Sequence, residues 1–147
     1  LPGVKVKDDR IRAIVPMSAP AVELNPARAY AAIRLPSMHM TGTLDDSPIN
    51  DTKAAERRIP YGRMTGADKY LINFEGGDHM IFSGRVVKFA RKRADADFQR
   101  SIKQASLAFW DAYLKNDASA AAWLRGEGLA RYLGKQASYE KTLMNKK

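Results

Sequence analysis

The sequence predicts an α/β fold in which three parallel strands, at about residues 11–16, 35–41 and 69–75, alternate with helices. Each of these segments is a short run rich in apolar residues, and helix start signals lie in the stretches between them. Strands that alternate with helices form parallel sheets with the helices packed against them. The length of 147 residues, with 45% hydrophobic and 28% charged residues, is typical of a globular chain with one core.

Each predicted strand ends at a residue that disfavours extended pairing. The first is an apolar run preceded by charge, and we expect it to end at Pro16, because proline cannot donate to a β-ladder. The second runs into Gly42. The third is rich in Tyr, Leu, Ile and Phe, and we expect Gly76-Gly77 to break it.

Two short helices are expected between the strands. Asn25-Pro26 supplies an N-cap followed by proline at the first helical position, which predicts a helix over residues 27–33. Asp51-Thr52 can cap a second helix over residues 53–58, and we expect Pro60 to end it.

The last third of the chain is predicted to be helical. Apolar residues recur at helical spacing over residues 97–115, which indicates a long amphipathic helix that packs on the sheet. Asp117 can cap a further helix that contains residues 120–124, and we expect helix again from Leu129 with a fraying, lysine-rich end.

An aspartate and a histidine follow two of the predicted strands directly. Asp45 ends the sequence Gly42-Thr43-Leu44-Asp45, and His79 ends Gly76-Gly77-Asp78-His79. If the two strands are neighbours, these residues meet at the sheet edge where the functional loops of open α/β sheets gather. The aspartate would then accept the Nδ1–H of the imidazole, and Nε2 would take a proton from a serine hydroxyl. The pattern predicts Asp45 as the acid and His79 as the base of a Ser-Asp-His triad.

Other residues could compete for these roles. Asp46 is adjacent to Asp45 but would point elsewhere if Asp45 faces the histidine, and Asp78 cannot easily orient the ring of its neighbour. His39 lies within the second predicted strand, and we interpret it as a sheet residue held by hydrogen bonds. The two histidines show no H-x-x-x-H or H-x-H spacing, so we expect no metal site, and no cofactor motif is present.

No nucleophile that fits this triad is found in the chain. A nucleophilic serine of this class sits on a G-x-S-x-G turn, and none of the eight serines has that context. The serines are Ser18, Ser37, Ser47, Ser83, Ser101, Ser106, Ser119 and Ser138. Because the chain begins at Leu1 and soon enters a strand-like run, we interpret residues 1–147 as a partial domain whose nucleophile lies N-terminal to it, and we expect the chain alone to be inactive.

At these residues the sequence resembles the dienelactone-hydrolase-like and related esterase branch of the α/β-hydrolase superfamily. The similar stretches are Asp9–Pro20, Leu35–Pro48, Tyr70–Gly84 and Ser106–Leu124. The resemblance implies the C-terminal half of that fold, with the sixth, seventh and eighth strands present and the first five strands, the nucleophile elbow and the oxyanion loop missing. It implies a serine hydrolase that cleaves carboxylic esters, with Asp45 and His79 in the acid and base roles.

A small-molecule ester is therefore the expected substrate. Residues 19–34 leave room for one helix only, which favours an open pocket without a large lid. Loop residues could line this pocket, or they could simply pack within their loops. These residues are Ser47, Pro48, Met80 and Phe82.

The net charge of +9 raises the alternative of a basic binding or interaction module with a degenerate hydrolase fold. Residues 85–147 carry 14 Lys or Arg against 6 Asp or Glu, and the tightest cluster contains Lys88, Arg91, Lys92 and Arg93. Few aromatic residues interleave with this cluster, so we interpret it as a solvated surface and expect no nucleic-acid partner.

No apolar run is long enough to span a membrane, and the absence of cysteine fits cytoplasmic and exported proteins equally.

Self-association is a further expectation of the partial-domain interpretation. A sheet without its central strands would expose the edge of the first strand, and such edges pair readily with other chains.

Overall fold

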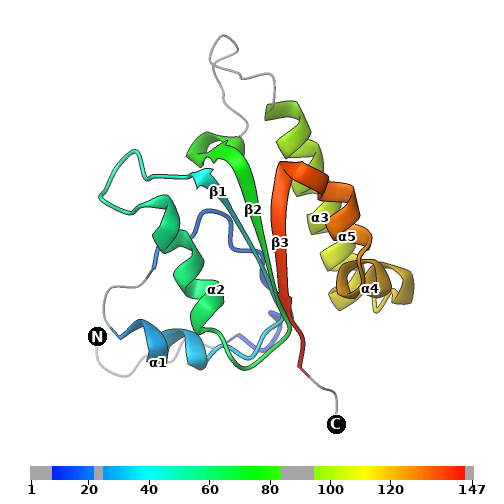
Figure 1. Cartoon of the computed structure of the whole chain (residues 1–147). Coiled ribbons are helices and arrows are strands. Elements are labelled where there is room, and N and C mark those ends of the chain that lie inside the picture. Colours follow the sequence, from blue (N-terminus) through cyan, green and yellow to red (C-terminus); the bar gives the residue numbers. More distant parts are fainter. Residues whose placement is uncertain (1–7, 22–24, 84–94, 145–147) are drawn as a thin grey trace.

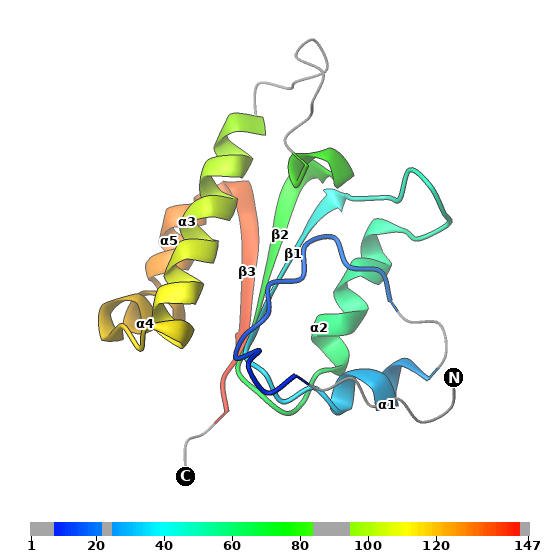
Figure 2. The same ribbon diagram turned by 180° about the vertical axis from the view of Figure 1, so that it is seen from behind.

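The computed structural model describes residues 8–21, 25–83 and 95–144. A three-stranded sheet lies between helices on its two faces, with α1 and α2 on one face and α3, α4 and α5 on the other (Figures 1 and 2). The strand order is β1 (Ser37–Leu44), β2 (Lys69–Asp78) and β3 (Ala137–Thr142). β1 and β2 are parallel, whereas β3 is antiparallel to β2. The α/β class is confirmed, but the sheet is mixed rather than purely parallel.

The strand expected at residues 11–16 does not form as a regular strand. Segment 8–21 runs parallel to β1 and makes only two isolated bridges with it, at Ile14 and Met17. Backbone hydrogen bonds of 2.8–3.0 Å join alternate residues of the segment to β1. Pro16 lies between the two bridges and has no N–H to donate, so the ladder is interrupted there.

β3 corrects the prediction of a helical C-terminal end. Helix α5 (Gly128–Leu133) stops at Gly134, whose φ of 54° suits glycine. After the turn η4 (Gly134–Gln136), the chain returns along β2. Tyr139 of β3 stacks on Tyr70 of β2 with their ring centroids 6.1 Å apart. An inward aromatic residue on an alternating segment suits a half-buried strand better than a fraying helix.

The two inter-strand helices form, with one correction. Helix α1 (Pro26–Ala31) begins as expected, because the Asn25 side chain accepts the Arg28 N–H. The second helical stretch consists of η1 (Ala54–Arg58) followed by α2 (Ile59–Arg63). Pro60 does not end this stretch: it sits in the first turn of α2, where a missing N–H costs nothing.

The cap of this second stretch also differs from the expectation. The side chains of Asp46 and Glu56, not those of Asp51-Thr52, accept the amide protons of Ala54 and Lys53, at 2.9 and 2.7 Å.

Helices α3 (Asp95–Leu114) and α4 (Ala118–Arg125) match the predicted long helix and its successor. The Asp117 side chain caps α4 by accepting the Ala120 N–H at 2.8 Å. Within the described ranges, no helix combines the length and apolarity needed to cross a membrane.

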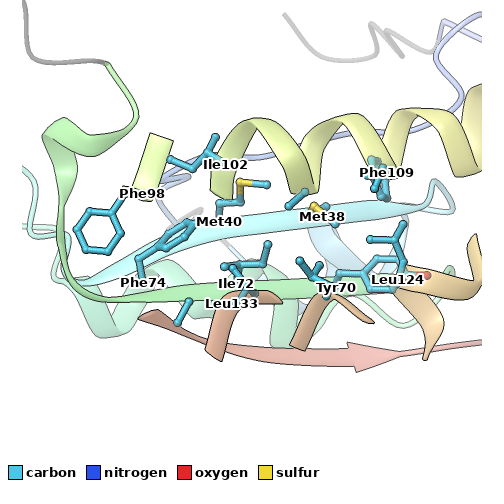
Figure 3. Packing of buried hydrophobic residues seen from close by; sticks show 14 of the residues in the cluster. Met38, Met40, Tyr70, Ile72, Phe74, Phe98, Ile102, Phe109, Leu124 and Leu133 are labelled. Carbon is cyan, nitrogen blue, oxygen red and sulfur yellow. The ribbon is translucent and has the colours of Figure 1, made fainter. Parts of the chain in front are cut away.

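The apolar core fills the space between the sheet and α3 (Figure 3). Alternate residues of each strand point to this face, as the two-residue period of a strand requires. The sheet contributes Met38, Met40, Tyr70, Ile72 and Phe74, and the helices contribute Phe98, Ile102, Phe109, Leu124 and Leu133.

A polar cluster ties the helices to the sheet at the amino end of β2. The Asp68 carboxylate accepts hydrogen bonds from the Tyr113 hydroxyl of α3 (2.8 Å) and from Arg125 of α4 (3.1 Å). Its other oxygen accepts the Met144 N–H at 2.8 Å. The Tyr113 hydroxyl also contacts that of Tyr70 at 2.8 Å, and burial together with these bonds raises the pKa of Tyr113.

The opposite face of the sheet is more polar and packs against α2. His39 is 3% exposed; its Nε2 contacts the Ser37 hydroxyl at 3.1 Å, and its ring meets Tyr61 edge-on. Lys69 reaches the same region and donates to the Met64 carbonyl at 2.6 Å. Burial, reinforced by the Lys69 charge, lowers the pKa of His39 to about 4. His39 is thus a sheet residue held by a hydrogen bond, as expected.

The low pKa of His39 predicts a pH-dependent stability. In the unfolded chain the imidazole takes up a proton near pH 6.5, but in the folded chain it does so only near pH 4, so the unfolded state binds more protons between these values. Stability therefore falls as pH drops through this window, and His39 accounts for about 3 kcal/mol of that loss. In urea unfolding at several pH values, the free energy of unfolding of His39→Gln should fall by about 3 kcal/mol less than that of the wild type as pH drops from 6.5 to 4. An equal fall in the two proteins would contradict the assignment.

Candidate active site

The carboxyl ends of β1 and β2 meet at one edge of the sheet, at the top of Figure 1. Asp45 is the first residue after β1, and His79 opens the single turn η2 (His79–Ile81) directly after β2. Since the two strands are neighbours and parallel, the short loops that follow them emerge side by side.

Asp45 and His79 are in direct contact. The Asp45 Oδ1 lies 3.0 Å from the His79 Nδ1. The Asp45 side chain is fully buried, whereas the His79 side chain is 37% exposed. The structure thus joins a shielded carboxylate to an imidazole that reaches solvent.

The remaining hydrogen bonds of the Asp45 carboxylate to described residues come from two hydroxyls. Thr41 of β1 donates to Oδ2 at 2.9 Å, and Ser18 donates to Oδ1 at 2.8 Å. A backbone hydrogen bond from the Asp45 N–H to the Gly42 carbonyl, at 3.1 Å, holds the turn that presents the carboxylate. Buried charges require such donors, because an unpaired buried carboxylate is strongly destabilising.

Ser18 is a site residue that the sequence analysis missed. It comes from segment 8–21, is 8% exposed, and places its Oγ 2.7 Å from the His79 Nδ1. The signal that could have found it is its position, because Ser18 follows the first predicted strand just as Asp45 and His79 follow the other two. Its neighbours two positions away are Pro16 and Pro20, not the glycines of a G-x-S-x-G turn.

The hydrogen bonds assign the proton of His79 to Nδ1. A carboxylate only accepts, so Nδ1 must donate to Asp45. The single hydroxyl proton of Ser18 goes to Asp45, and its oxygen is left to accept from the same Nδ1–H. Nε2 carries the free lone pair on the other side of the ring and makes no hydrogen bond to the described residues. A serine nucleophile must contact Nε2, so Ser18 does not occupy the nucleophile position.

Arg57 is a second residue that the sequence analysis missed. It projects from η1 and is 4% exposed. Its Nε donates to the Asp45 carbonyl at 3.1 Å and lies 3.7 Å from the Asp45 Oδ1, and its Nη1 donates to the Ser18 carbonyl at 2.6 Å. The planar guanidinium can bond both loops at once, as the single charged head of a lysine cannot. No feature of the sequence distinguishes Arg57 from the adjacent Arg58.

Two glycines allow β1 and β2 to approach closely beside the site. A Cβ added to Gly42 would lie 2.1 Å from the Gly77 carbonyl oxygen. The strand register shifts between Gly42 and Leu44, and Leu44 then pairs with Asp78. The prediction that Gly76-Gly77 breaks the strand is therefore wrong: the glycines form a bulge, and pairing resumes beyond them.

The two rival acids have other roles. The Asp46 Oδ1 accepts the Ala54 N–H, and its Oδ2 lies 3.6 Å from the Lys53 Nζ. The Asp78 side chain accepts the Met80 N–H at 3.0 Å and caps η2.

The residues proposed to line a substrate pocket lie in the two segments that follow β1 and β2. The Ser47 hydroxyl accepts amide protons of its own loop, and Pro48 is exposed. Met80 is 37% exposed beside His79, and Phe82 packs against Phe74 with ring centroids 6.4 Å apart.

The basic cluster over residues 88–93 lies outside the described residues. Among residues 8–21, 25–83 and 95–144, no three His, Asp or Glu side chains are grouped so as to hold a metal ion.

Comparison with known proteins adds no family assignment, because no protein-family model matches the chain and no curated protein is significantly similar to it.

Replacement of Gly42 by alanine should separate the strands at the site. Because the new Cβ would overlap the Gly77 backbone, we expect Gly42→Ala to lower the free energy of unfolding by about 2 kcal/mol or more. Gly62→Ala is the matched control, since Gly62 lies in α2 and a Cβ there meets nothing within 4 Å. Alanine should stabilise that helix by up to about 1 kcal/mol. Urea unfolding measures the free energy of unfolding of both variants. Equal changes in the two would contradict the close approach of β1 and β2 at Gly42 and Gly77.

Replacement of Arg57 should cost far more stability than replacement of its neighbour. Arg57→Met leaves the buried Asp45 carboxylate and two carbonyls without a cationic donor, so we expect a loss of about 3 kcal/mol. Arg58 forms an exposed ion pair with Glu140, so Arg58→Met should cost less than about 1 kcal/mol. Equal losses for the two variants in denaturant unfolding would show that Arg57 does not hold the site.

Proposed function

We propose that this chain supplies the acid and the base of a Ser-Asp-His hydrolase that cleaves carboxylic esters. The observation that carries the proposal is the 3.0 Å contact between the Asp45 Oδ1 and the His79 Nδ1, in which the carboxylate is fully buried and the histidine side chain is 37% exposed. A buried carboxylate that fixes the Nδ1–H tautomer prepares Nε2 as a general base.

The chemistry follows from this geometry. Nε2 would take the proton of a serine hydroxyl as its oxygen attacks the ester carbonyl, and the Asp45 carboxylate would stabilise the imidazolium that forms. The protonated Nε2 would then donate to the leaving alkoxide, which leaves an acyl-enzyme. A water molecule deprotonated by the same nitrogen would release the carboxylic acid and restore the serine.

The nucleophile in this proposal comes from outside the 147 residues. No serine of the chain has a G-x-S-x-G context, and the Ser18 hydroxyl lies at Nδ1 rather than at Nε2. The oxyanion hole would come with the nucleophile, because its donors are backbone amides beside that serine and in an earlier loop.

The arrangement of the strands supports a dienelactone-hydrolase-like, α/β-hydrolase setting for residues 1–147. Segment 8–21, β1 and β2 run parallel and side by side, in the order proposed for the sixth, seventh and eighth strands. The acid follows the second of these and the base follows the third. β3 is an addition to that pattern.

The test uses the hydrolase polypeptide that contains this chain together with its nucleophile. We expect Asp45→Asn to lower kcat on a short-chain nitrophenyl ester by about 10⁴-fold and His79→Ala to remove nearly all turnover. Asp46→Asn is the matched control and should keep the wild-type rate, because Asp46 caps η1 instead of contacting His79. Wild-type rates in the Asp45 and His79 variants would refute the proposal. A burst of nitrophenol from the 147-residue chain alone would refute an external nucleophile.

A further inference from the structure

All three polar groups of Ser18 are bound within the site. Its N–H donates to the Met40 carbonyl at 2.8 Å, its carbonyl accepts from Arg57 at 2.6 Å, and its hydroxyl contacts Asp45 at 2.8 Å and His79 at 2.7 Å. The hydroxyl of a serine on the surface would instead form its hydrogen bonds with water. Hydrogen bonds therefore hold both the backbone and the side chain of Ser18.

The backbone of Ser18 adopts a conformation that serine seldom uses. Its φ is +52°, in the left-handed region where a Cβ is disfavoured. Such a conformation persists where surrounding contacts over-determine it, and it is often found at functional sites. Here the left-handed turn occurs in the residue whose hydroxyl enters the site between Asp45 and His79.

The hydroxyl acts on both members of the pair. By donating to Oδ1 it orients the carboxylate, whose Oδ2 is held separately by Thr41. By accepting from Nδ1–H it gives the imidazole proton a second acceptor beside Asp45. A proton on Nε2 would leave Nδ1 without a hydrogen to donate and would place its lone pair against the carboxylate oxygen.

We propose that Ser18 is a positioning residue that keeps the proton of His79 on Nδ1 and so keeps Nε2 available as a base. This inference rests on the proposed function of His79 but is tested without turnover. Ser18 touches neither the ester nor the nucleophile in this scheme. It acts through the carboxylate and the imidazole.

The test is ¹⁵N NMR of the two histidine rings in the 147-residue chain at a pH where both are neutral. In the wild-type chain we expect the proton of His79 on Nδ1, with slow exchange against water. Two variants remove the hydroxyl: Ser18→Ala keeps the Cβ, and Ser18→Gly also suits the positive φ, so the fold is favoured in at least one. In both we expect the Nδ1 proton to exchange about tenfold faster, as loss of a hydrogen bond of this kind implies, and the Nε2–H form to become detectable.

A matched serine and histidine pair in the same chain provides the control. The Ser37 hydroxyl contacts the Nε2 of His39 at 3.1 Å, and Ser37 is the first residue of β1, whereas Asp45 follows the last. Ser37→Ala should therefore change the ring signals of His39 and leave those of His79 as in wild type. Both Ser18 variants should show the reverse.

The outcomes separate the two proposals. If the proton exchange and the tautomer of His79 are unchanged in both Ser18 variants, the proposed role of Ser18 is wrong. This holds even if the variants are less stable than the wild type. The assignment of Asp45 and His79 as acid and base would not be affected. A wild-type His79 that carries its proton on Nε2 would overturn the proposed function itself. In the active polypeptide, Ser18→Gly should lower kcat about tenfold with KM unchanged, far less than the loss expected for Asp45→Asn.

Discussion

A carboxylate that is fully shielded from water needs hydrogen bonds on both oxygens, and at Asp45 three separate parts of the chain supply them. Thr41 of β1 bonds to Oδ2, and Ser18 of segment 8–21 and His79 of η2 bond to Oδ1. A fourth part, Arg57 of η1, donates to the Asp45 main-chain carbonyl and lies 3.7 Å from Oδ1. Ser18 and His79 share Oδ1, whereas Thr41 is the partner of Oδ2 among the described residues, so loss of the Thr41 hydroxyl would leave a buried oxygen without a donor. The stability of this edge and the chemistry proposed for it therefore depend on the same contacts.

The geometry of the site also explains why a serine, an aspartate and a histidine in the right chain order do not make a complete triad here. Ser18, Asp45 and His79 are mutually within 3.0 Å, but all three meet at Nδ1. The nitrogen that would activate a nucleophile lies across the ring. The ring nitrogen that a serine contacts is therefore a better indicator of a nucleophile than the proximity of the three residues.

Residues whose roles follow from local pattern were predictable from the sequence, and residues whose roles depend on tertiary contacts were not. The two regular parallel strands and the contact between Asp45 and His79 follow from apolar runs and from the rule that strand ends meet. β3 was missed because its six residues include only one large inward side chain, Tyr139. Arg57 was missed because a buried and an exposed arginine look alike in sequence. Pro60 was misread because proline both ends helices and begins them.

The Asp68 cluster has a consequence for how the molecule could be altered. It fastens α3, α4 and the backbone of Met144 at the amino end of β2, the end of that strand farthest from His79. The two ends of β2 are thus held by different carboxylates, Asp45 and Asp68, which share no hydrogen-bond partner among the described residues. Substitutions around Asp68 would therefore act on contacts between the helices and the sheet that do not include the imidazole of His79.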